Sequence, residues 1–493
     1  MTHTVKTFKS FAWNHLSKLS EYGLTYLFGI YLARKIGAEG YSIYVTLMSL
    51  ASFSMILGGL GFDETVNKYV SQLSIQKQIG SIKYLIKSLI KLRTVILLFI
   101  ILIIVLLKNE IAYLLKAESL ASYLIILCVY ILFQSLVNLF ANIFIAENKT
   151  QTVFIINFLT KATTLLIGIL LLESGYGLYE IFILLAVMII ISFLSYFLVG
   201  RKYYRFKKAI RFNITVPLKF GVTTWGNMLL TFLMGKNSNV LILSFLMGTS
   251  PQISFYEIAF SLTQLIEYIF SIGFMGVALA SFSSLAVTDF GKLKNLRSSV
   301  TKYLQLFVLP LSIFVLFYAE FVVTTVFSNQ YRESVPLLRA FLIFTILSVS
   351  FLGSGANTAV LFAIGKERVV FLIHLIFGVI NILLIILFVP ESGIFWAMII
   401  TGACLFSTVL SEFIFATRKI GIVYDFRFLF KIVLISTLAL LVTYLIGRYL
   451  INNDYINLIS YFAIIFSGYL ITGIANKEVR LLMSQTKIDH LNK

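Results

Sequence analysis

Long apolar runs recur from one end of this sequence to the other, and they constrain its fold more than any other feature. Many are about 20 residues long, the length that an α-helix needs to cross the hydrocarbon core of a bilayer. Hydrophobic residues make up 59% of the chain and charged residues 12%, whereas soluble domains average nearly half and about a quarter, respectively. The sequence therefore predicts an all-α, polytopic membrane protein and argues against a soluble one.

These runs predict about fourteen transmembrane helices. They lie near residues 11–33, 41–62, 93–107, 120–146, 152–172, 178–199, 222–247, 254–280, 303–326, 337–363, 369–389, 393–416, 428–447 and 455–475. The first run has full spanning length and no small-residue cleavage site follows it, so we expect a retained helix and not a removed signal.

An internal repeat organises the first twelve of these helices. The helix–loop–helix pattern of Leu27–Leu50 returns in Val240–Leu265, about 214 residues later, and Glu173-Ser174-Gly175 returns as Glu391-Ser392-Gly393. A repeat of this length indicates a duplicated bundle, as in many transporters. The expected divisions are an N-terminal six-helix lobe at 1–210, a second six-helix lobe at 211–425, and two extra helices with a cytoplasmic tail at 426–493. The two lobes would be pseudo-symmetric around a central cavity.

The basic residues are distributed unevenly between alternate loops. Of the 40 Lys and Arg residues, about 30 fall in the loops and tails on one side and about 7 on the other, which predicts that both termini are cytoplasmic. This topology also explains the net charge of +19, so we expect no nucleic-acid partner. Lys83, Lys87 and Lys91 recur on one side of an amphipathic stretch, Ile75–Arg93, and predict a helix in the membrane interface.

The sequence contains no motif for a cofactor or a catalytic centre. Cys128 and Cys404 stand singly in apolar runs, so we expect neither a disulfide nor a metal site. Phosphate-binding glycine loops, zinc motifs and nucleophile elbows are missing from the sequence. We therefore expect a protein that is not an enzyme and needs no cofactor.

Three lysines lie within predicted spans and are candidate binding residues. Lys161 and Lys236 are near the middle of the fifth and seventh spans, and Lys18 is about seven residues into the first. An ionisable group at this depth costs about 2.5–3.5 kcal/mol on insertion scales and marks a functional site by default. One hypothesis is a cationic lumen for an anionic substrate. The alternative is internal pairing, of Lys18 with Glu21, and of Lys236 or Lys161 with Glu257 or Glu267.

Polar side chains within other spans favour a wet interior. Asn138 belongs to an i, i+4 series on the fourth span, Asn237 and Asn239 lie in the seventh, and His374 and Asn381 share a face of the eleventh. Such residues line a lumen or join helices by hydrogen bonds, and the sequence favours neither. Glu412 lies near the inner end of the twelfth span, where snorkelling to the interface explains it better.

With these features the chain resembles the polysaccharide flippase family of the multidrug/oligosaccharidyl-lipid/polysaccharide exporter superfamily. The resemblance rests on the duplicated halves, the Arg34–Tyr41 loop (RKIGAEGY), the Leu57–Phe62 motif (LGGLGF) and the two appended helices. It implies a V-shaped, two-lobe transporter with a central cavity, in which Lys18, Lys161 and Lys236 match the family's basic lumen residues. Some cation-coupled superfamily members have an Asp in the seventh span, where this chain has Asn237 and Asn239, so sodium coupling through that site is not carried over.

Three functions follow as hypotheses. The first is a flippase that moves undecaprenyl-diphosphate-linked oligosaccharide from the inner to the outer leaflet of a bacterial cytoplasmic membrane, as the resemblance implies. Its partners would be that lipid-linked glycan, membrane lipids, and a polysaccharide polymerase with other assembly proteins. The second is a cation-coupled multidrug antiporter, against which the lysines argue. The third is a membrane-embedded glycan polymerase or ligase, for which the outer loops are short.

Overall fold

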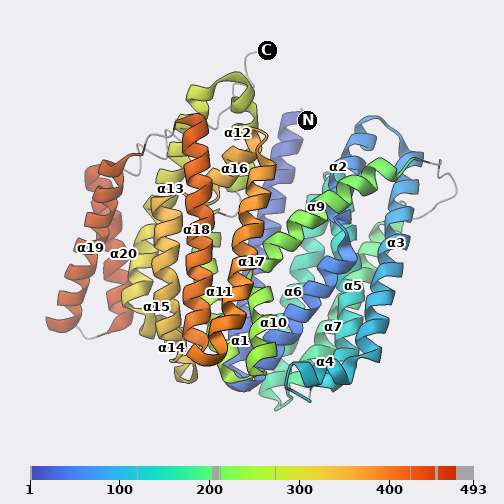
Figure 1. The fold of residues 1–493 in the computed structure, drawn as a ribbon, viewed down its shortest axis with the longest axis horizontal. Coiled ribbons are helices and arrows are strands. Elements are labelled where there is room, and N and C mark those ends of the chain that lie inside the picture. Colours follow the sequence, from blue (N-terminus) through green and yellow to red (C-terminus); the bar gives the residue numbers. More distant parts are fainter. Residues whose placement is uncertain are drawn as a thin grey trace. The chain divides into compact units, whose positions relative to one another are not determined.

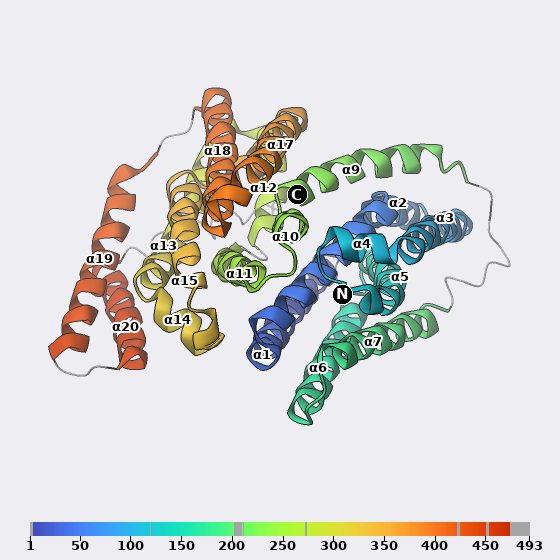
Figure 2. The same cartoon turned by 60° about the horizontal axis from the view of Figure 1, so that its bottom comes forward.

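The computed structural model describes residues 3–118, 120–201, 210, 212–271, 274–421, 424–449 and 453–473, and all regular secondary structure among them is helical (Figures 1 and 2). By its internal contacts the chain forms two compact units, Met1–Ser254 and Phe255–Lys493. The predicted all-α class is therefore confirmed.

The first unit contains two interrupted helices among its long spans. Its helices are α1 (His3–Gly59), α2 (Phe62–Ile75), α3 (Ile79–Leu106), α4 (Lys108–Leu114), α5 (Leu120–Ala146), α6 (Thr150–Glu173), α7 (Leu178–Val199), α9 (Thr215–Leu233) and α10 (Lys236–Met247). Gly37, with φ 77° and ψ 174°, breaks α1 into two legs. A bend of 56° separates α9 from α10, and only together are these two helices long and apolar enough to cross a membrane.

The second unit also contains a broken span. Its elements are α11, which begins just before the unit (Pro251–Ser271), α12 (Phe274–Thr288), α13 (Phe290–Phe317), α14 (Ala319–Val326), η1 (Asn329–Tyr331), α15 (Ser334–Thr345), η2 (Ile346–Phe351), α16 (Ala356–Ala363), α17 (Glu367–Ser392), α18 (Ile394–Ile420), α19 (Phe426–Tyr449) and α20 (Asp454–Thr472). The element η2 is π-helical, and two left-handed glycines, Gly353 and Gly355, separate it from α16.

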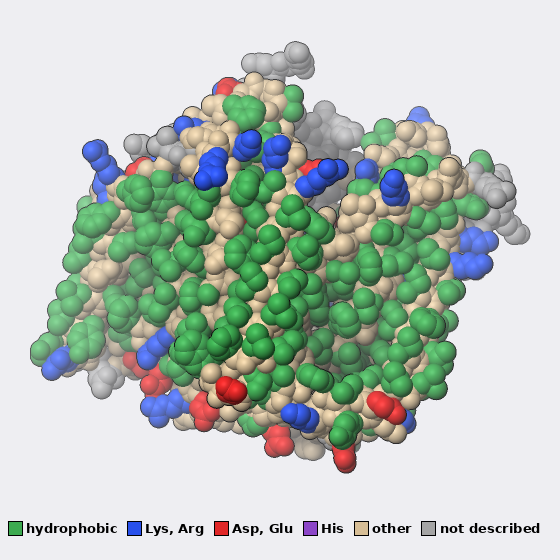
Figure 3. Space-filling model, in the orientation of Figure 1, with side chains coloured by type: hydrophobic (Ala, Val, Ile, Leu, Met, Phe, Trp, Pro, Cys, Tyr) green, Lys and Arg blue, Asp and Glu red, His purple; other side chains and the backbone are tan. Residues whose placement is uncertain are grey.

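Each of the fourteen predicted spans overlaps one of these helices or a broken pair. Among the described residues, 11 helices are long and apolar enough to cross a membrane, or 12 with the bent α9–α10 pair, and one of the 11 is the two-legged Leu16–Gly59. On the visible face of each unit, hydrophobic side chains cover the middle of the helices and charged ones gather mostly near the helix ends (Figure 3). This arrangement matches a multi-pass membrane protein.

The predicted interfacial helix over residues 75–93 is wrong. The chain turns after α2, and α3 then runs without interruption for 28 residues, so that Lys83, Lys87 and Lys91 belong to a span-length helix. The apolar side of this stretch, with Leu85 and Leu89 fully buried, packs in the core of the first unit. Its amphipathic pattern therefore reflects burial against protein and not against lipid.

Backbone conformation repeats along the chain as the predicted duplication requires. Gly248, between α10 and α11, has φ 74° and ψ −173°, nearly the values of Gly37. The left-handed Asn148 and Gly365 also lie at matching positions, and α3 and α13 both have 28 residues. Superposition of the two repeats, with a boundary at 210, remains a prediction. The contact-based division falls later because α9 and α10 pack on α1 and α2.

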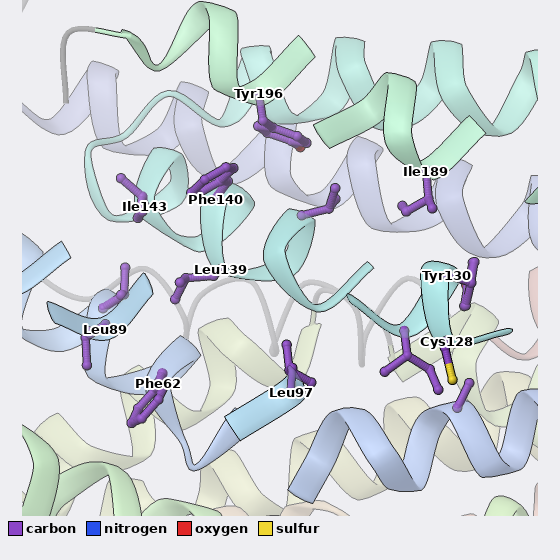
Figure 4. Close-up of a cluster of buried hydrophobic side chains, with 14 of the residues drawn as sticks. Phe62, Leu89, Leu97, Cys128, Tyr130, Leu139, Phe140, Ile143, Ile189 and Tyr196 are labelled. Atoms are coloured by element: carbon purple, nitrogen blue, oxygen red, sulfur yellow. The ribbon is translucent and has the colours of Figure 1, made fainter. Parts of the chain in front are cut away.

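Helix α5 lies at the centre of the first unit, where it packs against α1, α2, α3, α6 and α7. Its buried side chains meet those of the neighbouring helices in one apolar cluster, and Phe140 and Tyr196 represent α5 and α7 there (Figure 4). Gly61 and Gly221 allow α2 and α9 to approach closely, since a Cβ at Gly61 would lie 2.1 Å from the carbonyl oxygen of Gly221. This core surrounds the polar cavity described next.

Candidate functional site

A cavity of about 290 Å³ lies inside the first unit among α1, α2, α5, α6 and α7. Its charged lining residues are Lys18, Glu21, Asp63, Glu64 and Lys161. Its carboxamide lining residues are Gln134, Asn138, Asn142 and Asn157. Four of the residues predicted from the sequence, Lys18, Glu21, Asn138 and Lys161, therefore share one cavity.

Helical spacing explains how largely apolar helices present a polar face to this cavity. On α5, Gln134, Asn138 and Asn142 recur every four residues. On α6, Asn157, Thr160, Lys161 and Thr164 follow the spacing i, i+3, i+4, i+7. Residues at these spacings lie on one side of an α-helix. Both helices thus turn a polar stripe inward.

The two cavity lysines have no ion-pair or hydrogen-bond partner among the described residues. Neither Lys18, which is exposed, nor Lys161, which is half-buried, forms an ion pair or hydrogen bond with any residue that the structure describes. The alternative pairing of Lys18 with Glu21 is not formed, since Glu21 instead accepts a hydrogen bond of 3.4 Å from the amide of Asn157. Both ammonium groups therefore retain their capacity to bind an anion in the cavity.

The cavity also carries carboxylates, one of which is neutralised. Asp63 forms a two-pronged ion pair with Arg93, in which Nη1 lies 2.6 Å from Oδ1 and Nη2 lies 3.1 Å from Oδ2. Arg93 Nε donates to Ser135 Oγ at 2.8 Å, and the Arg93 side chain is 2% exposed. Two amines, Lys18 and Lys161, thus face two other carboxylates, Glu21 and Glu64, so the cavity has mixed charge and is not uniformly cationic.

The carboxamides of α5 act partly as links between helices. Asn142 accepts a hydrogen bond of 2.8 Å from Asn67 on α2, and Asn138 accepts one of 2.8 Å from Gln134. Asn157 on α6 in turn accepts a hydrogen bond of 2.9 Å from Tyr196 of α7. The polar stripe therefore fulfils both roles that the sequence left open, because it joins helices and lines the cavity.

Lys236, Asn237 and Asn239 lie outside this cavity, on α10. Lys236 is the first residue of α10, directly after the bend from α9. Asn237 accepts a hydrogen bond of 3.5 Å from Ser49 on α1, and Asn239 is fully buried. Thr46 and Ser244 also bond between α1 and α10 at 2.8 Å. This geometry favours a helix-joining role for Asn237, and a lumen role for Lys236 remains a prediction.

The remaining candidate residues lie in the second unit. Glu257 is buried and accepts a hydrogen bond of 2.9 Å from Ser261, Glu267 is partly buried, and Asn381 is buried. His374 Nε2 lies 3.0 Å from Glu412 Oε1. The expected snorkelling of Glu412 is wrong, because this residue is 1% exposed and also accepts a hydrogen bond of 2.7 Å from Thr358.

Sequence reasoning missed the Arg93–Asp63 pair and the tyrosine-bound Asn157. Arg93 ends a run of basic residues, and such a run is typical of a cytoplasmic loop. The unbroken α3 instead places its guanidinium inside the unit. Arg93 stands at the start of the third apolar run, and Asp63 directly follows the end of the second. Opposite charges at these two neighbouring ends are the sequence signal that could have predicted the pair.

Comparisons with known proteins agree with this architecture. A family model described as "Polysaccharide biosynthesis protein" matches residues 31–336. Lipid II flippase MurJ in an inward closed conformation superposes with a TM-score of 0.71 at 18% identity, covering 97% of this chain and 99% of that one. An inward-facing MATE multidrug resistance transporter of the MOP superfamily superposes with a TM-score of 0.65 at 11% identity, covering 83% of this chain and 94% of that one.

The outward-facing form described for such a MATE transporter gives a TM-score of 0.55 at 12% identity, covering 84% of this chain and 95% of that one. At these identities the likeness shows the fold alone. No curated protein sequence matches the chain. The family model, however, spans more than half of the 493 residues. The chain therefore belongs to the polysaccharide biosynthesis protein family and has the helical transporter fold shared by MurJ and the MATE transporters.

Proposed function

We propose that this protein is a flippase that moves undecaprenyl-diphosphate-linked oligosaccharide from the inner to the outer leaflet of a bacterial cytoplasmic membrane. One observation carries the proposal: Lys18 and Lys161 line a polar cavity in an apolar helical unit and have no partner among the described residues. An unpaired amine within a predicted membrane span, such as the half-buried Lys161, is costly unless it serves a ligand. A diphosphate would satisfy both through charge-assisted hydrogen bonds.

Each part of the cavity has a role in this proposal. Lys161 and Lys18 bind the diphosphate, while Asn138 and Thr160 offer hydrogen bonds to the first sugar or to water. The cavity volume of about 290 Å³ holds roughly ten water molecules at about 30 Å³ each. It therefore suits the charged headgroup, and the longer sugar chain and the lipid tail remain outside it.

The breaks in the spans supply hinges for alternating access. Gly37 divides α1, whose first leg carries Lys18, and the 56° bend divides α9 from α10. Rocking at such points would expose the cavity first to one side of the membrane and then to the other.

We place both termini in the cytoplasm by the Lys and Arg distribution, and a polymerase on the outer face would take the product.

A second candidate, a cation-coupled multidrug antiporter, is favoured by one specific feature. Glu21 and Glu64 share the cavity with the lysines, and within the described residues Glu64 Oε2 is buried without a hydrogen-bond partner. Such carboxylates attract cations, and the MATE fold is present as well. The flippase remains our proposal because neither amine has an ion-pair or hydrogen-bond partner among the described residues, whereas Glu21 already accepts a hydrogen bond from Asn157.

Transport by the purified protein in vesicles separates the two functions. The proposal expects a fluorescent lipid-linked oligosaccharide to move between leaflets faster than in protein-free vesicles, and a lipophilic cationic dye to show no added movement. Leaflet exchange would be measured by a membrane-impermeant quencher. Accelerated movement of the dye, with none of the oligosaccharide, would instead support the antiporter.

A further inference from the structure

A second cavity, of about 740 Å³, lies in the second unit between the N-terminal ends of α13 and α19. One wall is a single face of the first two turns of α13, with Gly291, Lys294, Asn295 and Ser298 at the spacing i, i+3, i+4, i+7. The segment Tyr424–Arg427, which leads into α19, forms the other wall. We call this cavity the α13–α19 groove.

An ion pair fixes the two walls of the groove against each other. Lys302 on α13 lies 2.8 Å from Asp425, and its amine also lies 5.1 Å from the ring centroid of Phe428. Burial by itself would raise the pKa of Asp425, but hydrogen bonds from Lys302 and from the Phe428 backbone lower it on balance. Asp425 is therefore ionised and already neutralised by Lys302.

The side chains of two cations in the groove have no partner among the described residues. Neither the Lys294 amine nor the Arg427 guanidinium forms an ion pair or hydrogen bond there. Asn295 and Ser298 add neutral donors on the same wall. Because the groove also lies at the N-terminal ends of two long helices, their dipoles add to the positive potential there. These features together favour a phosphate-bearing ligand.

The surface beside the groove indicates the source of that phosphate. Phe426, Phe430, Leu434 and Leu438 recur every four residues along α19, with exposed fractions of 70%, 67%, 45% and 51%. This apolar stripe starts at the groove and continues along the length of a membrane-spanning helix. A free phosphate ion would make no use of it, whereas the acyl chains of a lipid would lie along it.

We propose that the α13–α19 groove binds the headgroup of an anionic phospholipid, whose acyl chains pack along the exposed stripe of α19. Lys294 and Arg427 contact the phosphate, and Asn295 and Ser298 hydrogen-bond it. Basic sites between transmembrane helices on the cytoplasmic side bind anionic headgroups in this way. The groove shares no lining residue with the cavity of Lys18 and Lys161, so we assign a resident lipid to the groove and the transported substrate to the cavity.

The test measures lipid association with the full-length protein in bilayers of phosphatidylethanolamine. Spin-labelled phosphatidylglycerol should be immobilised preferentially over labelled phosphatidylethanolamine. The double variant Lys294→Gln/Arg427→Gln should lower that preference roughly fivefold for each cation removed. The matched control Lys292→Gln/Arg418→Gln removes two exposed charges, near the start of α13 and the end of α18, that do not line the groove. It should keep the preference, with equal thermal stability in all three proteins.

Three outcomes would overturn the proposal. An equal loss of the phosphatidylglycerol preference in the control variant would mean that the preference comes from the general positive potential of the surface. Displacement of the labelled lipid by millimolar pyrophosphate would mean a site for free phosphate. Stronger competition by undecaprenyl diphosphate than by phosphatidylglycerol would mean a site for the transported lipid. Because the readout is binding of phospholipid, its result does not depend on whether the protein transports a glycan.

Discussion

Replacement of Lys161 by alanine is expected to lower export of the lipid-linked glycan at least tenfold while the amount of protein in the membrane stays unchanged. Lys161 lines the first-unit cavity without an ion-pair or hydrogen-bond partner among the described residues, so its removal takes away a ligand contact and breaks no such bond there. A hydrogen bond to a charged group contributes about 1.5–3 kcal/mol, which corresponds to roughly 10- to 100-fold in binding. Surface glycan in cells that depend on the variant measures the effect.

Three further variants control this experiment. Lys161→Arg should retain partial export, because the charge is kept while the donor geometry changes. Lys18→Ala should have a smaller effect, since this side chain is exposed and better solvated. Lys292→Ala, at a surface lysine that is 69% exposed, should leave export at the wild-type level. Wild-type export by Lys161→Ala would show that the cavity lysine does not serve the substrate.

Replacement of Asp63 by alanine is expected to destabilise the protein by about 3–5 kcal/mol, because it leaves the buried guanidinium of Arg93 without its counter-ion. Thermal unfolding in detergent, followed by intrinsic fluorescence, would measure the change. The double variant Asp63→Leu/Arg93→Met should recover most of the lost stability, since an apolar pair of similar volume replaces the buried ion pair.

The matched control for this prediction is Glu320→Ala. Glu320 pairs with Arg332 at 2.7 Å, but both side chains are at least half exposed, so its loss should cost at most about 1 kcal/mol. Equal losses for Asp63→Ala and Glu320→Ala would contradict the special importance assigned to the buried pair. If the double variant Asp63→Leu/Arg93→Met does not recover the lost stability, Arg93 has a further role, through Ser135 or through the cavity.

Sequence periodicity predicted the helices well, because each span must satisfy its own backbone hydrogen bonds and show an apolar surface to lipid. The same reasoning singled out Lys161 as a candidate, since a charge in the middle of an apolar run is visible without any tertiary information. It failed for Ile75–Arg93, where an amphipathic pattern fits a helix on lipid and a helix on protein equally well. The unbroken course of α3 decided between them.

Pairing between distant residues was beyond the sequence. Glu412 lies near the end of its span, and its partners His374 and Thr358 come from two other helices. In the same way, Asp63 lies 30 residues before Arg93 along the chain, and a turn brings them together. A single sequence reveals the cost of each charge but not the contact that offsets it. The mixed charge of the first-unit cavity therefore became visible in the structure.

Binding of undecaprenyl diphosphate to the purified protein decides whether Lys18 and Lys161 hold the diphosphate of the substrate. Native mass spectrometry would compare undecaprenyl diphosphate with undecaprenyl monophosphate, on the wild type and on Lys18→Ala/Lys161→Ala. The wild type is expected to prefer the diphosphate, and the double variant is expected to lose this preference, with at least about tenfold weaker binding. Equal affinity of both proteins for the diphosphate would contradict this role of the two lysines.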